Sequence, residues 1–404
     1  EAKGRDPIQS FSSKLIAEGE ISEEEFRQLA LEVKQEMDAA VTAVLSSPEP
    51  GPEAARDHVW SGMATGKAPA AAQSEPAAQT MTYIQAVNAA LATELANRPE
   101  VLVYGEDVGR SGGIFGAAKG LQQKFGENRV FDTPISESAI LGSAVGAALM
   151  GMKPVVEIMW ADFMLVALDQ IVNQAANVRY ITGGRSGAPI VVRTQQGTTP
   201  GSCAQHSQSL EALLAHIPGI RVATPATPQD AYSILRAAAA ASDPCVIFES
   251  RGLYATSGPV RLSDEVEPLG GARLRKPGKD AVIVTWGTML RAALEASDQL
   301  QSEGVQAAVL DLRWLCPLDQ RALQQALAAS SGRVVVAHEA NLTGGFGAEI
   351  VARLHELSRE MGITLKAARV GSPDIRMPAA PVLQRELLPN AGRIAEAVRK
   401  MIAG

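Results

Sequence analysis

Residues 138–157, SAILGSAVGAALMGMKPVVE, contain the two patterns that decide the fold. The first part is a glycine- and alanine-rich apolar run, which predicts a buried helix over about Ser138–Met150. A short apolar segment at Pro154–Glu157 follows and predicts a buried strand. A buried helix that leads directly into a buried strand is typical of an α/β domain, in which helices cover a mostly parallel sheet.

The same alternation extends over two parts of the chain. Between residues 81 and 265, a helix is predicted near Tyr83–Ala96 and strands at Val101–Tyr104, Ile190–Arg193, Arg221–Ala223 and Cys245–Phe248. Residues 266–277 are rich in proline, glycine and arginine and are predicted to form a connector. Strands then recur at Ala281–Thr285, Ala307–Leu312 and Arg333–His338, with a helix from Gly347. We therefore expect two α/β domains, residues 81–265 and 278–404.

The first 60 residues differ from the rest in charge and pattern. They hold 13 acidic and 6 basic residues, a net charge of −7, which is the formal charge of the whole 404-residue chain. Ser22 and Glu25 form a predicted capping box, and an apolar residue then recurs every three or four positions from Phe26 to Val44. This pattern predicts an amphipathic helix that must dock on another surface. Residues 61–80 contain almost no large apolar side chain and predict a flexible linker.

Composition excludes several classes of protein. The acidic balance argues against general binding of nucleic acid. Apolar runs such as Ala139–Met152 are shorter than the ~20 residues of a membrane span, and no signal peptide pattern is present. The three cysteines are far apart and form neither a disulfide framework nor a CxxC metal pair, so a cytoplasmic setting is predicted. The sequence begins at Glu1 rather than Met, so we expect residues upstream.

Two polar segments could carry chemistry. In the first, Asp132–Glu137 (DTPISE), Glu137 stands where an extended turn enters the predicted helix, so its carboxylate should be partly desolvated. The alternative is an acid that only complements the helix dipole. In the second, His206 follows the glycine-bearing loop Gly197–Gly201 and could transfer protons at neutral pH. Its alternative is a surface histidine.

Other conspicuous residues are interpreted as structural. Gly344-Gly345-Phe346-Gly347 lacks a phosphate-binding motif and predicts a tight turn between a strand and a helix. His216 and His338 are predicted to be structural, the latter because it ends an apolar strand. No metal-ligand cluster is apparent in the sequence.

A set of motifs in a fixed order carries a family resemblance. The segments TPISES, EIMWADFMLVALDQIVN, AQHSQSLEALLAHIPG, FESRGLY, LDLRWLCPLD and VAHEANLTGGFGAEI together resemble the β subunit of thiamine diphosphate-dependent 2-oxo acid dehydrogenases, which act on pyruvate, branched-chain 2-oxo acids or acetoin. The resemblance covers about residues 80–404. It implies a pyrimidine-type thiamine diphosphate-binding α/β fold, a mostly parallel sheet covered by helices, followed by a transketolase C-terminal-like α/β domain for assembly.

The resemblance also implies roles for individual residues. Glu137 matches the glutamate that hydrogen-bonds the pyrimidine ring nitrogen of the cofactor and promotes the tautomer that removes a proton. Ile135, Met159 and Phe163 match positions that wall the aminopyrimidine, and ordinary core packing is their alternative. His206 matches the histidine that assists acyl transfer to lipoamide.

The resemblance further implies partners. Residues 1–60 resemble the C-terminal tail of the α subunit of this family. The α-type GDG motif, which binds the diphosphate and Mg²⁺, does not occur in the sequence. The rest of the cofactor site is therefore expected on an α-type partner in an α2β2-like assembly, or upstream of this sequence. A lipoyl acyltransferase core is a further expected partner.

Some positions depart from the family pattern. The loop TQQGTTPGSC before His206 is not the usual glycine-rich loop, and Phe115 stands where many relatives have Tyr. A structural potassium site is doubtful because Ala238–Pro244 offers only Asp243 as a ligand. Two alternatives therefore stay open: a thiamine-dependent carboligase that joins the bound group to another carbonyl or acyl carrier, and a non-catalytic assembly subunit.

Overall fold

The computed structural model describes residues 6–62 and 77–403. The chain divides into two units, Glu1–Asp57 and His58–Gly404. Within the described ranges, no helix is both long and apolar enough to cross a membrane. The predicted linker falls mostly on residues 63–76, which lie outside the described residues. Its last part differs from the prediction, because strand β1 (Gln79–Thr82) begins within it.

The N-terminal unit consists of helices α1 (Pro7–Ala17), α2 (Glu23–Leu45) and η2 (Pro52–Arg56). The predicted capping box is confirmed: the Glu25 amide donates to Ser22 Oγ at 3.1 Å, and the Ser22 amide donates to Glu25 Oε2 at 2.7 Å. The apolar side chains of both helices are largely exposed, namely Ile8, Phe11, Leu29, Val33, Met37, Val41 and Val44. This unit therefore has apolar faces that it does not bury itself.

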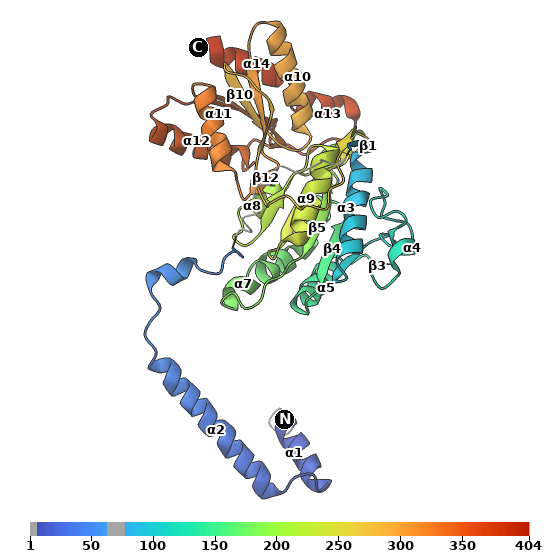
Figure 1. Ribbon diagram of the computed structural model, residues 1–404, viewed down its shortest axis with the longest axis vertical. Helices are drawn as coiled ribbons and strands as arrows, with labels where there is room; N and C mark the ends of the chain where they lie inside the picture. Colours follow the sequence, from blue (N-terminus) through green and yellow to red (C-terminus); the bar gives the residue numbers. More distant parts are fainter. Residues whose placement is uncertain (1–5, 63–76, 404) are drawn as a thin grey trace. The chain divides into compact units, whose positions relative to one another are not determined.

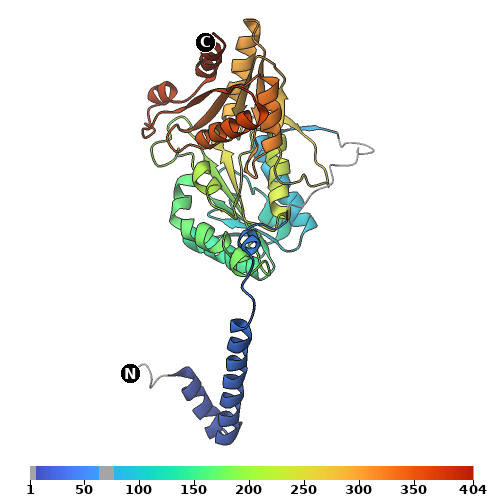
Figure 2. The ribbon, with the colours of Figure 1, turned by 90° about the vertical axis from the view of Figure 1, so that its left-hand side faces the viewer.

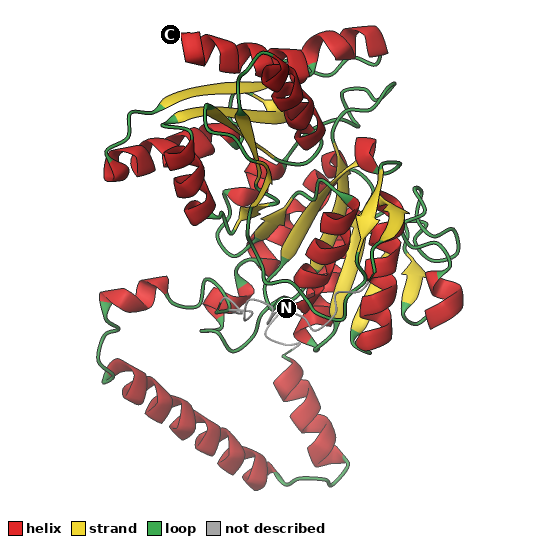
Figure 3. Ribbon diagram, turned by 45° about the horizontal axis from the view of Figure 1, so that its top comes forward, coloured by secondary structure: helices red, strands yellow, loops and turns green. Residues whose placement is uncertain are grey.

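The second unit contains two layered sheets, each with helices on both faces (Figures 1 and 3). The first sheet has the strand order β12-β6-β7-β5-β4-β2-β3. Its strands are β2 (Val101–Gly105), β3 (Val130–Asp132), β4 (Lys153–Ile158), β5 (Val191–Gln196), β6 (Arg221–Ala223), β7 (Cys245–Ser250) and β12 (Trp314–Cys316). All neighbours are parallel except the β12–β6 pair. The predicted parallel α/β architecture is confirmed.

Alternation along the strands of the first sheet separates its two faces. Val155 packs into a core with α3 (Tyr83–Asn97) and α9 (Pro228–Ala240), whereas Val156 packs into another with α5 (Glu137–Leu149). Successive side chains of a strand point to opposite faces, so a strand covered on both sides is apolar throughout. Figure 1 shows α3 and α9 side by side on their face of the sheet.

The second sheet has the order β14-β13-β10-β11-β9. Its strands are β9 (Arg273–Lys276), β10 (Ala281–Thr285), β11 (Ala307–Asp311), β13 (Arg333–Asn341) and β14 (Lys366–Ser372). Helices α10 (Met289–Ser302) and α14 (Ala391–Ala403) share a core on one face, and α11 (Gln320–Ala329) and α12 (Gly347–Met361) share a core on the other (Figures 1 and 2).

Short elements connect these layers. They are α4 (Leu121–Phe125), α6 (Ala161–Met164), η3 (Leu165–Ala167), η4 (Gln170–Ala175), α7 (Val178–Ile181), α8 (Glu211–Ala215), η5 (Arg251–Leu253), β8 (Ser257–Val260) and α13 (Pro381–Leu387). Strands β1 and β8 pair with each other as a separate antiparallel ribbon. The segment η4 is a π-helical turn, which adds one residue to the turn that carries it.

The segment predicted as a connector, residues 266–277, is more ordered than expected. Part of it forms β9, which pairs antiparallel with β11 at the edge of the second sheet. Two arginines two positions apart explain this: Arg273 and Arg275 point to the same side of the strand and reach buried carboxylates. The prediction rested on the low apolar content of this stretch and missed the charges that hold it.

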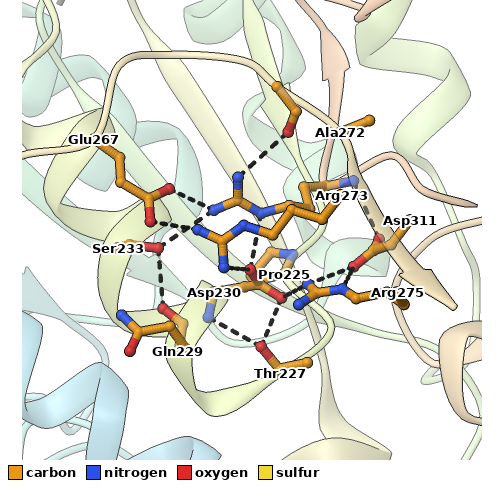
Figure 4. A network of polar contacts seen from close by, with 12 residues as sticks. Pro225, Thr227, Gln229, Asp230, Ser233, Glu267, Ala272, Arg273, Arg275 and Asp311 are labelled. Atoms are coloured by element: carbon orange, nitrogen blue, oxygen red, sulfur yellow. Dashed lines mark hydrogen bonds and ion pairs between the residues drawn. The ribbon is translucent and has the colours of Figure 1, made fainter. Parts of the chain in front are cut away.

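Those arginines belong to a charged network that joins the two sheets (Figure 4). Asp230 of α9, fully buried, accepts hydrogen bonds from Arg313 Nε at 2.8 Å and from Arg275. Arg275 also donates to Asp311 at the end of β11, and Arg313 donates to Glu267 at 2.7 Å. Asp230 belongs to α9, which covers the first sheet, whereas Arg275 and Asp311 belong to strands of the second sheet. The network therefore fixes the two sheets against each other.

Candidate active site

Five residues predicted to form the site follow three parallel strands of the first sheet. Ile135 and Glu137 come after β3, Met159 and Phe163 come after β4, and His206 comes after β5. In the strand order, β2 lies between β3 and β4, and β5 follows β4. The carboxyl ends of parallel strands lie along one edge of the sheet, and ligands of α/β proteins bind at this edge.

Glu137 is the first residue of α5 and is half-buried. Its carboxylate has no hydrogen-bond or ion-pair partner among the described residues. Ile135, two residues earlier, is 83% exposed although it is apolar. The helix continues into the sheet core with Ile140 and Leu141, which explains why the segment is fixed while its first turn stays accessible. A heteroaromatic ligand could bind here, with a ring nitrogen hydrogen-bonded to the Glu137 carboxyl group and a ring face against Ile135.

The segment that carries Met159 and Phe163 packs against the start of α5. Ser138 Oγ, next to Glu137, donates to the Val166 carbonyl at 2.7 Å. Met159 and Phe163 are both half-buried, Phe163 as part of α6. This packing holds the acid and the two apolar side chains on adjoining segments. Glu137 and His206, in contrast, share no hydrogen bond or ion pair in the described part of the chain.

His206 lies in an aromatic environment. The ring centroids of His206 and Trp160 are 5.1 Å apart and those of His206 and Phe163 are 5.4 Å apart, both with nearly perpendicular planes. Cys203 Sγ lies 3.7 Å from His206 Nδ1. The structure therefore brings His206 and the predicted wall residue Phe163 into direct contact. Trp160, which the sequence reasoning missed, joins them, and its only signal was its place in the motif EIMWADF.

The loop before His206 is fixed by residues far away in sequence. The Thr198 amide donates to Glu339 Oε1 at 2.5 Å, and Gln384 Nε2 donates to the Ser202 carbonyl at 2.6 Å. Burial raises the pKa of Glu339, although bonds from Thr198 and Thr288 favour its charged form. Residues from the second half of the molecule therefore hold this loop in place.

Glu106 is a further acid near the site that the sequence reasoning missed. It directly follows β2, the strand between those that lead to Glu137 and to Met159. Burial raises the pKa of the Glu106 carboxyl, and the nearby negative charges of Glu137 and Asp107 raise it further. The Glu106 carboxyl therefore accepts a proton more readily than an exposed glutamate does. The sequence could have indicated Glu106 by its position, because it directly follows the predicted buried strand at Val101–Tyr104.

Beneath this surface lies a buried group of charges. Arg193 donates to Glu157 at 2.7 Å and to Glu249 at 2.7 and 2.9 Å, and Tyr254 donates to Glu249 at 2.6 Å. Burial raises the pKa of Glu157 while the Arg193 charge lowers it. All three ionic side chains are at most 4% exposed. They lie on β4, β5 and β7, so this group fixes the spacing of the strands that carry the site.

Comparison with known proteins identifies the family. Residues 79–256 match the transketolase pyrimidine binding domain and residues 270–394 match the transketolase C-terminal domain. The chain is 38% identical over 323 residues to the 2-oxoisovalerate dehydrogenase subunit beta of Bacillus subtilis, across 80% of this chain and 98% of the relative. The chain belongs to the 2-oxo acid dehydrogenase β-subunit family.

Other members of this family are similarly close. The pyruvate dehydrogenase E1 component subunit beta of Bacillus subtilis is 39% identical, with coverage of 80% of this chain and 98% of the relative. The acetoin:2,6-dichlorophenolindophenol oxidoreductase subunit beta of Cupriavidus necator is 39% identical, with coverage of 81% and 99%. The predicted family is confirmed. The two domain matches begin at residue 79, so the resemblance of residues 1–60 to an α-subunit tail stays a prediction.

A solved structure agrees on the fold. A split-gene transketolase, described as an inactive beta4 tetramer, aligns with a TM-score of 0.63 over 80% of this chain and 98% of that chain, at 24% identity. At this identity the likeness supports the fold alone. Together with the two sheets described above, it confirms the predicted transketolase-like α/β architecture.

Asp243, the one acid considered as a potassium ligand in this β-subunit family member, is bound by two arginines. Asp243 accepts hydrogen bonds from Arg179 Nε at 2.9 Å and from Arg221 Nη2 at 2.8 Å. Ser61 adds its amide at 2.9 Å and its hydroxyl at 2.8 Å, and the neighbouring Trp60 ring lies 4.5 Å from the Arg221 guanidinium. The Asp243 charge is therefore neutralised by side chains, and His58–Ser61 is fastened to the sheet-bearing unit at this point.

The residues of this β-subunit family member fit the pyrimidine half of thiamine diphosphate. Glu137 offers a carboxylate without a partner in the described residues, and Ile135 offers exposed apolar surface next to it. Phe163 and Met159 are partly exposed on the adjoining segment. A ring that is apolar on its faces and carries a basic nitrogen on its edge matches this donor set. No group of three or more potential metal ligands occurs among the described residues.

Proposed function

We propose that this chain is the β-type subunit of a thiamine diphosphate-dependent 2-oxo acid dehydrogenase. The assembly would decarboxylate a small 2-oxo acid and pass the acyl group to lipoamide. The observation that carries the proposal is the Glu137 carboxylate, which has no partner among the described residues, beside the exposed side chain of Ile135. Both lie on the sheet edge that also carries His206. Family membership supports the same function.

In this proposal Glu137 acts on a proton. Its carboxyl group donates a hydrogen bond to, or shares a proton with, a ring nitrogen of the cofactor pyrimidine. Glu106 is a second acid near Glu137, and burial together with the charge of Glu137 raises the pKa of the Glu106 carboxyl. Ile135, Met159 and Phe163 contact the pyrimidine faces and exclude water. The chemistry that bound thiamine diphosphate supplies is that of an electron sink for the bond that breaks.

His206 acts at the acyl-transfer stage in this proposal. Its imidazole is held between Trp160 and Phe163 by edge-on ring contacts, which limit its rotation. Neutral imidazole can give or take a proton near neutral pH, as transfer to the sulfur atoms of lipoamide requires. The role rests on the geometry around His206 and on the family motif AQHSQ.

The proposal also includes partners. An α-type subunit would supply the GDG diphosphate motif and the Mg²⁺ ligands, in an α2β2-like assembly with the site at the interface. The relatives are themselves named as beta subunits, which supports a multisubunit arrangement. The exposed apolar faces of α1 and α2 would contact the α-type partner. We also propose that the assembly binds a lipoyl acyltransferase core and that it is located in the cytoplasm.

A second candidate function keeps the cofactor but changes the acceptor. The loop Gly197–Cys203 departs from the family pattern, and its last residue places a thiol 3.7 Å from His206 Nδ1. The altered loop sequence is the reason to consider a carboligase, which would form a new carbon–carbon bond. Product analysis separates the two: acylated lipoyl domain supports the dehydrogenase, and a coupled carbonyl product supports the carboligase.

The Glu137→Gln variant tests the proposal directly. In an assembly reconstituted with the α-type partner, thiamine diphosphate and Mg²⁺, we expect decarboxylation to fall by roughly 10²- to 10⁴-fold, because the amide cannot exchange the proton. Release of CO₂ is the measurement. Glu349→Gln is a matched control, since Glu349 is also a first-turn glutamate, on α12, and forms an exposed ion pair with Arg353. Unchanged CO₂ release in Glu137→Gln would overturn the proposal.

A further inference from the structure

Arg251 is a cation that the site described so far does not use. It begins η5 directly after β7, at the same carboxyl edge of the sheet, and is half-buried. Its guanidinium carbon lies 4.8 Å from the ring centroids of both Phe115 and Trp160, and its Nη1 donates to Thr199 Oγ1 at 3.1 Å. Within residues 6–62 and 77–403, no carboxylate forms an ion pair with it.

Arg251 adjoins both segments that surround His206. Trp160, which stacks edge-on against the His206 ring, is one of the two rings that contact the guanidinium. Thr199 belongs to the loop that leads to His206. A single aromatic ring thus separates the unpaired cation from the proposed acyl-transfer histidine. The Phe115 ring also contacts the guanidinium, and it packs edge-on against Trp160 with the ring centroids 5.7 Å apart.

The neighbouring acids are already engaged. Glu157 and Glu249 pair with Arg193, and Glu339 accepts hydrogen bonds from Thr198 and Thr288. Arg251 forms no ion pair with any of these acids in the described chain, so its charge is available to a ligand. A guanidinium has five N–H donors in a planar fork, of which one is used on Thr199, so donors remain for a planar anion.

We propose that Arg251 binds the carboxylate of the 2-oxo acid substrate, an inference that rests on the proposed function. Arg251 forms no covalent bond and moves no proton: it pairs with the carboxylate while that group is still attached to the carbonyl carbon. When the carbon–carbon bond breaks, the electron pair stays on the acyl fragment and the carboxylate leaves as neutral CO₂. The ion pair therefore exists with the substrate and is lost with the product.

This timing predicts which kinetic constant changes. An interaction made with the bound substrate lowers KM, whereas an interaction that grows in the transition state raises kcat. Because the carboxylate loses its charge as CO₂ forms, the ion pair weakens toward the transition state. Removal of the cation should therefore raise KM strongly without lowering kcat.

The experiment is a charge series at position 251 in the reconstituted assembly. Arg251→Lys keeps the charge without the fork, Arg251→Gln removes the charge, and Arg251→Glu reverses it. We expect KM for the 2-oxo acid to rise in this order, by about 10- to 100-fold in Arg251→Gln, the range of one lost charged hydrogen bond. The inhibition constant of an acylphosphonate analogue, which keeps an anion but cannot release CO₂, should rise in parallel.

Two controls separate the possible failures. Arg353→Gln, on the exposed face of α12, should leave KM unchanged, and the Kd of thiamine diphosphate should be the same in all variants. If the wild-type assembly turns over no 2-oxo acid, the proposed function is wrong and the Arg251 assignment falls with it. If wild type is active but KM does not follow the charge at position 251, or only kcat falls, the Arg251 assignment alone is overturned.

Discussion

At the scale of single residues, burial without a partner is the most informative feature. His338, at the carboxyl half of β13, is fully buried, and neither ring nitrogen has a hydrogen-bond partner in the described residues. Its ring stacks on Trp286 at 5.5 Å with nearly parallel planes, and Gly345 and Gly347 pack closely against it. The prediction that His338 is structural agrees with this packing, and the turn Gly344–Gly347 is the close approach that it requires.

Because the pKa of His338 is lowered, we expect the free energy of unfolding to decrease in acid. Burial, together with the positive charge of Arg369, lowers the pKa of His338 from 6.5 to about 4. The unfolded chain therefore binds a proton at His338 more readily than the folded chain does. The contribution of neutral His338 to the free energy of unfolding is complete above pH 6.5 and is lost as the pH falls toward 4, by about 3 kcal/mol in all. Urea unfolding at several pH values between 7 and 4 measures it.

The matched variants for this prediction are His338→Asn and His355→Asn. His355 is exposed on α12. We expect His338→Asn to be less stable at pH 7, because it leaves a cavity, but to lose less further stability in acid than wild type. His355→Asn should follow wild type. An unchanged acid dependence in His338→Asn would show that His338 does not titrate in this way.

At the scale of elements, short-range patterns set where helices begin. The capping box of α2 and the strand-to-helix turn at α12 both lie where the local sequence predicts them. Edge strands behave differently. Strand β9 forms in a segment of low apolar content because its arginines meet buried acids, and β12 pairs with β6 about 90 residues earlier in the chain. Contacts across such separations decide these elements.

The Ser22→Ala variant tests the capping box. The variant removes the acceptor for the Glu25 amide at the start of α2, whose side chains are otherwise exposed. We expect roughly fivefold faster amide hydrogen exchange in the first turns of α2, the size of one lost N-cap. Ser46→Ala is the control, because Ser46 Oγ only donates to a carbonyl of its own helix at the other end. Equal exchange in both variants would contradict the assignment.

At the scale of the whole molecule, the two sheets of the second unit behave as one body. One apolar core contains side chains of both sheets, such as Val156 of β4 and Val284 of β10. Strand β12 follows the second sheet's β11 in sequence but pairs in the first sheet. The charged network of Asp230, Arg313 and Glu267 adds a third connection. We therefore expect the two sheets to unfold together.

The Arg313→Met variant tests this coupling. Arg313 is 4% exposed, and its loss leaves Asp230 and Glu267 with fewer partners in a desolvated position. We expect a loss of about 3–5 kcal/mol in the free energy of unfolding, against less than about 1 kcal/mol for Arg353→Met at an exposed pair. Hydrogen exchange of β5 and β10 should increase together. An increase confined to one sheet would contradict a single cooperative unit.

The sequence by itself determined most of the helices and strands and the family, and it supplied the candidate site residues as a prediction. Helix and strand periods, capping residues and turn glycines act within a few positions, so they can be read locally, and the motifs around Glu137 and His206 lie in contiguous stretches. The ring contact between His206 and Phe163 joins two such motifs, and the helix–strand order placed both at one sheet edge.

Only the tertiary structure decided which side chains meet across the chain. The pKa of Glu106 is raised by burial and by Glu137, which follows a neighbouring strand, and Arg251 contacts the rings of Phe115 and Trp160, which are more than 90 residues away from it. Asp243 is neutralised by Arg179, 64 positions earlier. Such pairings depend on strand order and on the burial of charge. A local sequence pattern does not reveal either one, because the free energy of a charge depends on everything packed around it.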